Sequence, residues 1–228
     1  MIQDSLKNRK HVVDYSTTII PTREEINNIL ATAYPLVTSK QKGYPYQVHI
    51  LGPNKARSKE LWELCEGNKI DTDIGALGEA GSRYRSNPGL YHMYSSPWTL
   101  IYGPRVAPAN AFYRQAFDNT NSLWELEDKD FVNTRNRESC AIEIGMLAKA
   151  ITGATLDQGW DTSYNVCFPR QFKKWVNFPH LEFTPALIQT IGKGVKYKWE
   201  DMGPENSKLD IDAPFDDIFK YIDKEDYN

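Results

Sequence analysis

Residues 135–152 read RNRESCAIEIGMLAKAIT and form the most strongly helical stretch of the chain. Apolar residues recur around most of the helical circumference, which is typical of a helix that is buried on most sides. In a chain of 228 residues, such a helix is expected at the centre of a domain or in a subunit interface. We expect Gly153 to end this helix, because glycine often follows a helix C-terminus. A strand or loop is predicted over 156–160.

Other segments place further elements around this helix. Thr22 and Glu25 form a capping-box pattern that predicts a helix over 23–34. The remaining periodic segments predict helices over 2–10 and 55–66, and strands over 46–51, 97–103 and 185–192. Residues 67–95 are rich in glycine and predict loop with short helix. The pattern alone therefore predicts an α+β domain with few strands and several helices.

Charge is distributed unevenly along the chain. Residues 209–228 contain seven acids and two lysines, a net charge of −5, whereas the whole chain has −3, which leaves +2 for residues 1–208. We therefore expect one domain over 1–208 and an acidic C-terminal arm or helix over 209–228. The positive excess is too small to indicate a nucleic-acid partner. No apolar run approaches membrane-spanning length, and the start lacks the apolar region of a signal peptide, so a cytoplasmic location is expected.

The cysteines and histidines give no sign of a metal site or a catalytic triad. Cys140 lies within an apolar helical run and is expected to be a core residue. The three cysteines are too far apart for a zinc motif. Neither a G-x-G-x-x-G nor a G-x-x-x-x-G-K-[ST] motif is present, so the sequence does not indicate a Rossmann or P-loop nucleotide site.

Three polar segments could carry chemistry. The first, Arg9-Lys10-His11, is a basic cluster that either complements the dipole at a helix C-terminus or binds a phosphate. The second is a polar loop that ends in Pro45 and Tyr46 and leads into the strand that follows. The third is the basic segment after Gly192. Together they could hold the phosphate and the ring edges of a flat cofactor.

In this order, the segments resemble those of the FMN-dependent nitroreductase family. Arg9 and Lys10 match family positions that bind the flavin phosphate and the edge of the ring. His11 stands where the family usually has serine, and Val13 where it usually has lysine or arginine. The missing cation at Val13 weakens the expected cofactor site.

The polar loop resembles the family loop that reaches across a dimer to the flavin of the partner subunit. Ser39, Pro45 and Tyr46 match that loop, and Gln41 or Lys42 replaces its usual asparagine. The resemblance therefore implies that the loop of one subunit completes the cofactor site of the other.

The resemblance also implies contacts near the end of the long helix and after the last core strand. Gln158 and Gly159 match the segment whose backbone N–H approaches the reactive nitrogen of the flavin, although Gly159 could equally be a simple turn residue. After Gly192, a lysine is expected to complete the phosphate site. The candidates are Lys193 and Lys196, with Lys198 and Lys208 as further possibilities.

The resemblance implies a fold, a cofactor and a reaction class. The expected fold is a three-layer α+β domain with a central antiparallel-type sheet flanked by helices, and the expected assembly is a homodimer that binds FMN. In such enzymes NAD(P)H reduces FMN, which passes hydride to a small aromatic or quinone-like acceptor, such as a nitroaromatic compound. One alternative is a dimer of the same fold that has weakened or lost FMN binding and acts as a binding or structural protein. Another keeps the flavin for a specialised step.

Overall fold

A computed structural model describes five continuous ranges and six single residues of the chain. These are 9–37, 44–76, 91–105, 129–166 and 183–197, with Leu6, Ser39, Phe168, Trp175, Phe178 and Leu181. Side chains are described throughout except at 66–76, at Tyr91 and at 129–139. The predicted acidic segment 209–228 and most of the predicted helix over 2–10 lie outside the described residues.

The described strands form two antiparallel sheets. The larger sheet has the order β2-β3-β5-β4, with β2 at Tyr46–Leu51, β3 at Trp98–Pro104, β5 at Leu187–Gly192 and β4 at Asp161–Asn165. The smaller sheet pairs β1 at Val12–Tyr15 with β6 at Gly194–Tyr197. All four pairings are antiparallel. The prediction of a central antiparallel-type sheet is confirmed.

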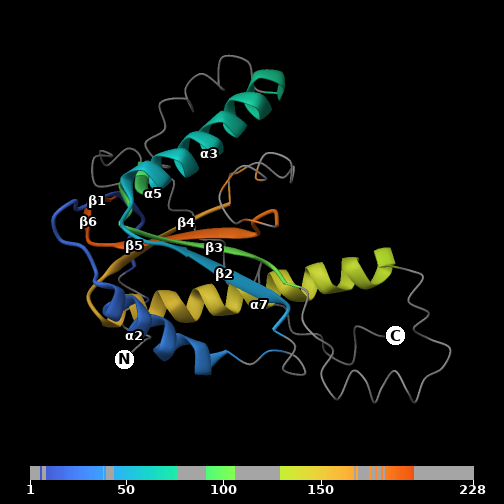
Figure 1. The fold of residues 1–228 in the computed structure, drawn as a ribbon, viewed down its shortest axis with the longest axis horizontal. Coiled ribbons are helices and arrows are strands. Elements are labelled where there is room, and N and C mark those ends of the chain that lie inside the picture. Colours follow the sequence, from blue (N-terminus) through green and yellow to red (C-terminus); the bar gives the residue numbers. More distant parts are fainter. Residues whose placement is uncertain are drawn as a thin grey trace, which may run out of the picture. The chain divides into compact units, whose positions relative to one another are not determined.

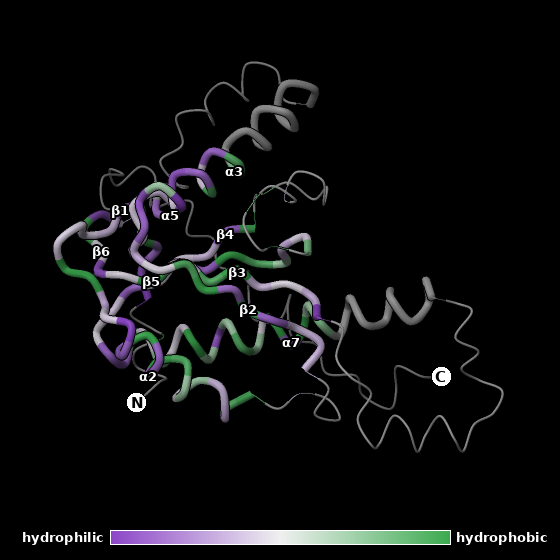
Figure 2. Tube along the Cα trace, viewed as in Figure 1, coloured by the Kyte–Doolittle hydropathy of each residue, from purple (hydrophilic) through white to green (hydrophobic). Residues whose placement is uncertain are grey.

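Helices cover both faces of the larger sheet (Figure 1). On one face lie α2 at Arg23–Ala33, the short 3₁₀ helix η1 at Tyr34–Leu36, and α7 at Lys129–Asp157. On the other lie α3 at Lys55–Ala76 and α5 at Tyr91–Ser95. Strand β3 shows why both faces are covered, because Leu100 and Tyr102 belong to one core cluster and Ile101 to the other. In Figure 2, hydrophobic residues run along β3 and recur at intervals along α7. The predicted three-layer α+β fold is confirmed.

Helix α2 forms as its sequence predicts. The Thr22 hydroxyl accepts from the Glu25 backbone N–H at 3.2 Å, and the Glu25 carboxylate accepts from the Thr22 N–H at 2.7 Å. This capping box satisfies two of the N–H groups that a helix start leaves without partners. Ile26, Ile29 and Ala33 then fall on one face and are buried against α7.

Helix α7 ends later than predicted. Gly153 lies inside the helix and is buried, so the expectation that it terminates the helix is wrong. The helix stops instead at a Schellman motif. The Gly159 N–H donates to the Leu156 carbonyl at 3.0 Å and the Trp160 N–H to the Thr155 carbonyl at 3.1 Å. Gly159 has a φ of +79°, which glycine adopts without the steric cost that a Cβ brings.

The prediction that this helix is buried on most sides is wrong for the single chain. Ile142 is 65% exposed and Met146 is 46% exposed, although Ile144 and Ile151 are buried. The apolar pattern therefore covers one face that packs on the sheet and a second face that does not contact the rest of the described chain to the same degree.

Several short elements are absent from the sequence-based prediction. Strands β1, β4 and β6 have four or five residues each and lack a clear alternating pattern. Helix α3 continues to Ala76, past the end predicted at residue 66, so its last turns replace part of the loop predicted over 67–95.

Cys140 is 4% exposed and belongs to a core cluster, which confirms its prediction as a core residue.

Candidate functional site

The small β1–β6 sheet brings the two ends of the described chain together. Val12 lies opposite Tyr197, and Asp14 lies opposite Lys196. The basic cluster at residues 9–11 immediately precedes β1, and Lys193 immediately precedes β6. Because the two strands are antiparallel, the basic cluster lies at the Tyr197 end of the pair and Lys193 lies beside Ser16 at the other end. The Tyr197 side chain links the two ends, since its ring lies 4.9 Å from the Lys10 ammonium and its hydroxyl lies 3.3 Å from Asp161, which is 4.0 Å from the Lys193 ammonium.

Strand β1 is also tied to the larger sheet. The Val12 N–H donates to the Ser163 hydroxyl at 2.8 Å, and that hydroxyl donates to the Val12 carbonyl at 3.1 Å. The Tyr15 N–H donates to the Ser95 hydroxyl at 3.0 Å. These bonds hold the backbone of β1 in place. Because the basic cluster directly precedes β1, they also limit where the side chains of the cluster can lie.

Arg9 lies on an aromatic platform. Its guanidinium carbon is 4.6 Å from the centroid of the Tyr164 ring, a cation–π distance. The Tyr164 hydroxyl donates to the Ala148 carbonyl at 3.0 Å and also bonds the Thr152 hydroxyl. Within the described part of the chain, the Arg9 Nε atom is buried and has no hydrogen-bond partner. A buried donor without a partner is costly, so this atom is suited to bind an external acceptor.

A buried hydrogen-bond network is connected to the Tyr164 ring through the Thr152 hydroxyl. The Tyr102 hydroxyl donates to the Gln189 side-chain oxygen at 2.5 Å. The Gln189 amide donates in turn to the Thr152 hydroxyl at 3.2 Å and to the Thr162 hydroxyl at 3.0 Å. Burial raises the pKa of Tyr102 well above its usual value, so its hydroxyl stays protonated and able to donate. The network is therefore a fixed support and contributes no charge to the site.

Lys10 and His11 also have aromatic neighbours. The Lys10 ammonium is 4.9 Å from the centroid of the Tyr197 ring, and it is solvent-exposed. The His11 ring meets the buried His92 ring edge-on at 5.7 Å. His92 Nδ1 is 2.9 Å from the Thr190 hydroxyl. Lys10 is thus positioned near β6, and His11 packs towards α5.

The turn after α7 lies close to Lys193. The Lys193 ammonium donates to the Gly159 carbonyl at 3.2 Å. The N–H groups of Gln158 and Gly159 both donate to helix carbonyls, so neither is available to a flavin in this conformation. The space beside Gly159 is open, because a Cβ added there would meet nothing within 4 Å. The predicted contact between this turn and a cofactor stays a prediction. Within the turn, a flat ring could approach the open face of Gly159.

Asp161 lies among these groups and was not identified from the sequence. Its carboxylate accepts from the Gly194 N–H at 2.9 Å and lies 4.0 Å from the Lys193 ammonium. The Tyr197 hydroxyl lies 3.3 Å from this carboxylate and 3.1 Å from the Gly194 carbonyl, and its one proton is shared between these two acceptors. Its side chain is 20% exposed. No local pattern identifies this residue, because the groups it contacts lie 32 to 36 residues further along the chain.

Two further positions that the resemblance singles out, Lys196 and Val13, lie on β6 and β1. Lys196 is exposed on β6, opposite Asp14. Val13, which stands where the resemblance implies a cation, is 4% exposed and belongs to the protein interior. Lys198 and Lys208 lie outside the described residues.

The Ser39 loop is not brought to this cluster within one chain. Ser39 is buried, and its hydroxyl accepts from the Tyr44 N–H at 2.7 Å. The neighbouring Pro45 carbonyl accepts from the Cys140 thiol at 3.3 Å. Cys140 precedes the end of α7 by 17 residues, which is about 26 Å along the helix axis. Gln41 and Lys42 lie outside the described residues, so their predicted role stays a prediction.

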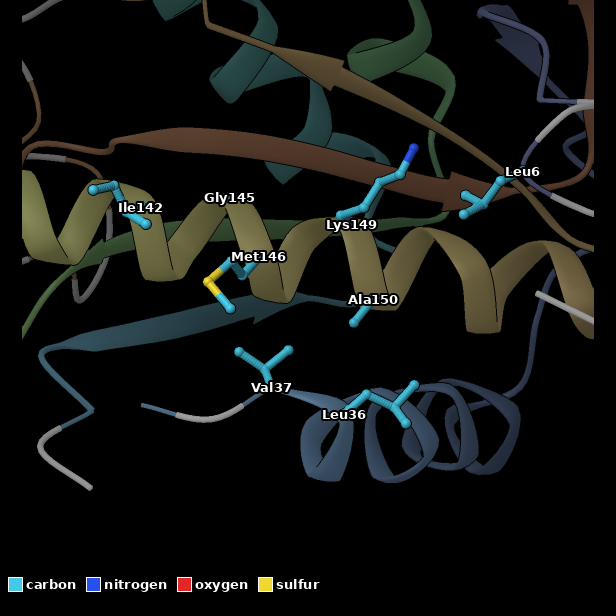
Figure 3. Close-up of a pocket in the computed structure, with 8 residues that line it drawn as sticks. All are labelled: Leu6, Leu36, Val37, Ile142, Gly145, Met146, Lys149 and Ala150. Atoms are coloured by element: carbon cyan, nitrogen blue, oxygen red, sulfur yellow. The ribbon is translucent and has the colours of Figure 1, made fainter. Parts of the chain in front are cut away.

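An open apolar groove of about 600 Å³ runs along the exposed face of α7 (Figure 3). Its lining comes from α7, from η1 with the residue after it, and from the N-terminal segment: Leu6, Leu36, Val37, Ile142, Gly145, Met146, Lys149 and Ala150. Figure 3 shows Met146 pointing towards Val37 across the groove. Leu36 is 56% exposed and adds to the apolar surface.

The described residues give little support for thiol or metal chemistry. Burial and the Glu143 carboxylate raise the pKa of Cys140 to about 11, so the thiol is protonated at neutral pH and is a poor nucleophile. No group of three or more metal-ligating side chains occurs in the described ranges. None of the described helices has the length and apolar content that crossing a bilayer requires.

The fold is similar to solved structures whose names include an FMN oxidoreductase and nitroreductases. A proposed NAD(P)H:FMN oxidoreductase from Staphylococcus epidermidis ATCC 12228 is 14% identical, covers 97% of this chain and 96% of its own, and has a TM-score of 0.63. A proposed nitroreductase from Exiguobacterium sibiricum 255-15, in complex with FMN, is 14% identical with 97% of each chain covered and a TM-score of 0.63. A nitroreductase family protein from Streptococcus pneumoniae TIGR4 is 16% identical, covers 97% and 100%, and has a TM-score of 0.60.

No family model matches the sequence, and no curated protein matches it either. The structural likeness spans nearly the whole chain, so the chain has the nitroreductase fold. The fold implied by the resemblance is confirmed. At these identities the likeness defines the fold, and the activity has to be argued from the site.

Proposed function

We propose that the protein is an FMN-dependent oxidoreductase of nitroreductase type. It takes hydride from NAD(P)H and delivers it to a small electrophilic acceptor such as a nitroaromatic compound or a quinone. The observation that carries the proposal is Arg9, whose buried Nε has no partner within the described residues while its guanidinium is held over Tyr164. The structural neighbours include an FMN complex and a proposed NAD(P)H:FMN oxidoreductase, and this supports the choice of cofactor and donor.

The residues of the site fit a phosphorylated flavin. Arg9, Lys10 and Lys193 supply positive charge from two ends of the chain, and guanidinium and ammonium groups are the usual donors to phosphate. Gly159 leaves open space beside the turn, where a flat ring can approach the backbone. Lys196 is a further cation on β6, where it is exposed and lies opposite Asp14.

When bound, FMN supplies the hydride chemistry, and the protein supplies binding and orientation. Arg9 and Lys10 would hold the phosphate, and the fixed Tyr164 platform would limit the movement of the Arg9 guanidinium. His11, beside the buried His92, would define one edge of the site. This division of labour is consistent with the lack of an acid–base pair among these residues, and we assign no catalytic side chain.

We further propose that the active form is a homodimer formed over the exposed face of α7. Ile142, Met146 and Leu36 give this face an apolar surface that a monomer would leave in water. A second copy that covers it would also bring its own Ser39 loop, which in one chain lies about 26 Å along α7 from the turn at Gly159. The dimer therefore supplies both the cover for the groove and the contact that one chain does not make. The cytoplasmic location stays a prediction.

A second candidate is a dimer of this fold that binds FMN weakly or not at all and serves as a binding protein. Three observations favour it. Val13 is buried where the resemblance implies a cation, the N–H groups of Gln158 and Gly159 are used by the helix cap, and Asp161 places a carboxylate among the cations.

One experiment separates the two candidates. The protein is purified and its visible spectrum is recorded before and after addition of FMN. Flavin bound at about one per chain, reduced by NADPH or NADH and reoxidised by a quinone, supports the enzyme. A colourless protein whose melting temperature does not rise with added FMN contradicts it and favours the binding protein. An Arg9→Met variant is measured in the same way. It removes the donor on which the proposal rests, and its FMN binding should be weaker than that of wild type.

A further inference from the structure

Asp161 is surrounded by groups that suit an anion. A backbone N–H from Gly194, the hydroxyl of Tyr197 and the ammonium of Lys193 all approach its carboxylate, at 2.9, 3.3 and 4.0 Å. The same Tyr197 ring lies 4.9 Å from the Lys10 ammonium. An N–H, a hydroxyl and an ammonium that converge are also the donors with which proteins bind phosphate.

The carboxylate is better explained by its charge than by turn formation alone. Lys193, the residue between β5 and β6, is also tied to the end of β1, because its carbonyl accepts from the Ser16 N–H at 2.7 Å. The Lys193 side chain is 45% exposed, yet its ammonium bends back to the Gly159 carbonyl and towards Asp161. Lys193 is therefore partly neutralised within the chain and contributes less positive potential to an external anion.

We infer that Asp161 sets the affinity of this site for phosphate, because its carboxylate occupies the place where Lys193, Gly194 and Tyr197 would otherwise meet an external phosphate monoester. The ligand class rests on the proposed function, in which that phosphate belongs to FMN. A phosphate monoester carries a charge of about −1.5 to −2 at neutral pH and is repelled by a carboxylate at this position. Asp161 is thus a specificity-determining residue: it lowers the contribution of the phosphate to the affinity for FMN, relative to the contribution of the flavin ring.

The test compares Asp161→Asn with wild type in the full chain. Asparagine keeps the size of the side chain and an oxygen that can accept from Gly194 and Tyr197, but it removes the charge. FMN, riboflavin and inorganic phosphate are titrated separately by calorimetry. We expect FMN and inorganic phosphate to bind roughly threefold to tenfold more tightly, the size of one partly exposed charge interaction, with riboflavin unchanged. A purely structural role of Asp161 would change all three probes or the melting temperature.

Two further variants complete the design. Asp157→Asn removes the same charge from an exposed position in the last turn of α7 and is expected to leave all three affinities unchanged. Lys193→Gln is expected to weaken FMN binding less than threefold in wild type, because Asp161 already offsets its charge. This variant tests the inference even if Asp161→Asn does not fold.

The inference is overturned if Asp161→Asn binds neither FMN nor inorganic phosphate more tightly. It is also overturned if Asp157→Asn gives the same gain, or if Lys193→Gln loses as much FMN affinity as Arg9→Met. Failure of the proposed function looks different. In that case wild type binds no FMN, and a gain in phosphate affinity in Asp161→Asn still supports the role of this carboxylate.

Discussion

Replacing Ile142 by lysine tests the proposed dimer, on which the proposed shared cofactor site depends. Ile142 lies on the exposed face of α7 and is 65% exposed in the single chain. Burying a whole isoleucine side chain contributes about 1.5–3 kcal/mol, so covering its exposed part contributes roughly 1–2 kcal/mol per subunit. A two-fold interface contains the residue twice, which gives roughly 2–4 kcal/mol per dimer.

This energy corresponds to a dissociation constant about 30- to 900-fold higher in the Ile142→Lys variant. The monomer itself should stay folded, because the side chain contributes little to its core and lysine is a good helix former. Sedimentation velocity over about a thousandfold range of protein concentration measures the shift directly. The matched control is Ile19→Lys, an exposed isoleucine (55%) in the loop that follows β1, which should leave the dimer unchanged.

The variant also links assembly to cofactor binding. If Ser39 reaches the flavin of the partner, FMN should dissociate from Ile142→Lys at the protein concentrations at which the dimer dissociates. A variant that remains dimeric with the affinity of wild type would refute the assignment of this face. A monomeric variant that still binds FMN with full affinity would refute the contribution of the Ser39 loop.

Three further predictions concern the site and its supporting helices. Arg9→Met should weaken FMN binding by about 10- to 150-fold, the value of a hydrogen bond to a charged group, with a smaller effect on riboflavin, as measured by calorimetry. Gly159→Ala should lower the free energy of unfolding by about 1–2 kcal/mol in denaturant titrations, because φ is +79° and no clash is added. The hydrogen bonds from Thr22 lower the pKa of Glu25, so the stability they provide is present above the unfolded pKa and is lost as pH falls through the folded one. The larger part of this effect comes from the Thr22 backbone N–H, which Thr22→Ala keeps. The variant loses the hydroxyl that caps the Glu25 N–H and should be less stable by about 1 kcal/mol, and the difference in melting temperature should narrow only slightly in acid.

Local elements were predictable where their cause lies within a few residues. The α2 start was predicted because Thr22 and Glu25 satisfy each other over three positions. Strands β1 and β6 were not, because each has four residues and the pair joins Val12 to Tyr197. A pairing across nearly the whole chain leaves no signal in a local window.

Two glycines near the end of α7 show what a local pattern cannot distinguish. Gly153 was wrongly predicted to end the helix, and of the two alternatives for Gly159 the structure shows the turn, while the cofactor contact stays a prediction. Both glycines come late in the helical pattern, but only Gly159 takes the positive φ of a helix end. Gly153 is buried inside α7, where packing keeps the helix intact despite the low helix propensity of glycine. Propensity is a weak prior that burial overrides, and burial depends on residues far away in the sequence.

The candidate site shows the same division between local and distant causes. Arg9, and Lys193 as one of several lysines, could be named from the sequence because the family resemblance points to their segments, and the structure places both next to strands of the β1–β6 sheet. Asp161 could not, because an acid after Trp160 is unremarkable until β5 and β6 place Gly194 and Tyr197 against it. An expectation built from cations alone therefore overestimates the positive charge of the site. Since the strength of a phosphate site depends on the balance of both signs, the proposed effect of Asp161 on phosphate affinity rests on a residue that only the folded chain identifies.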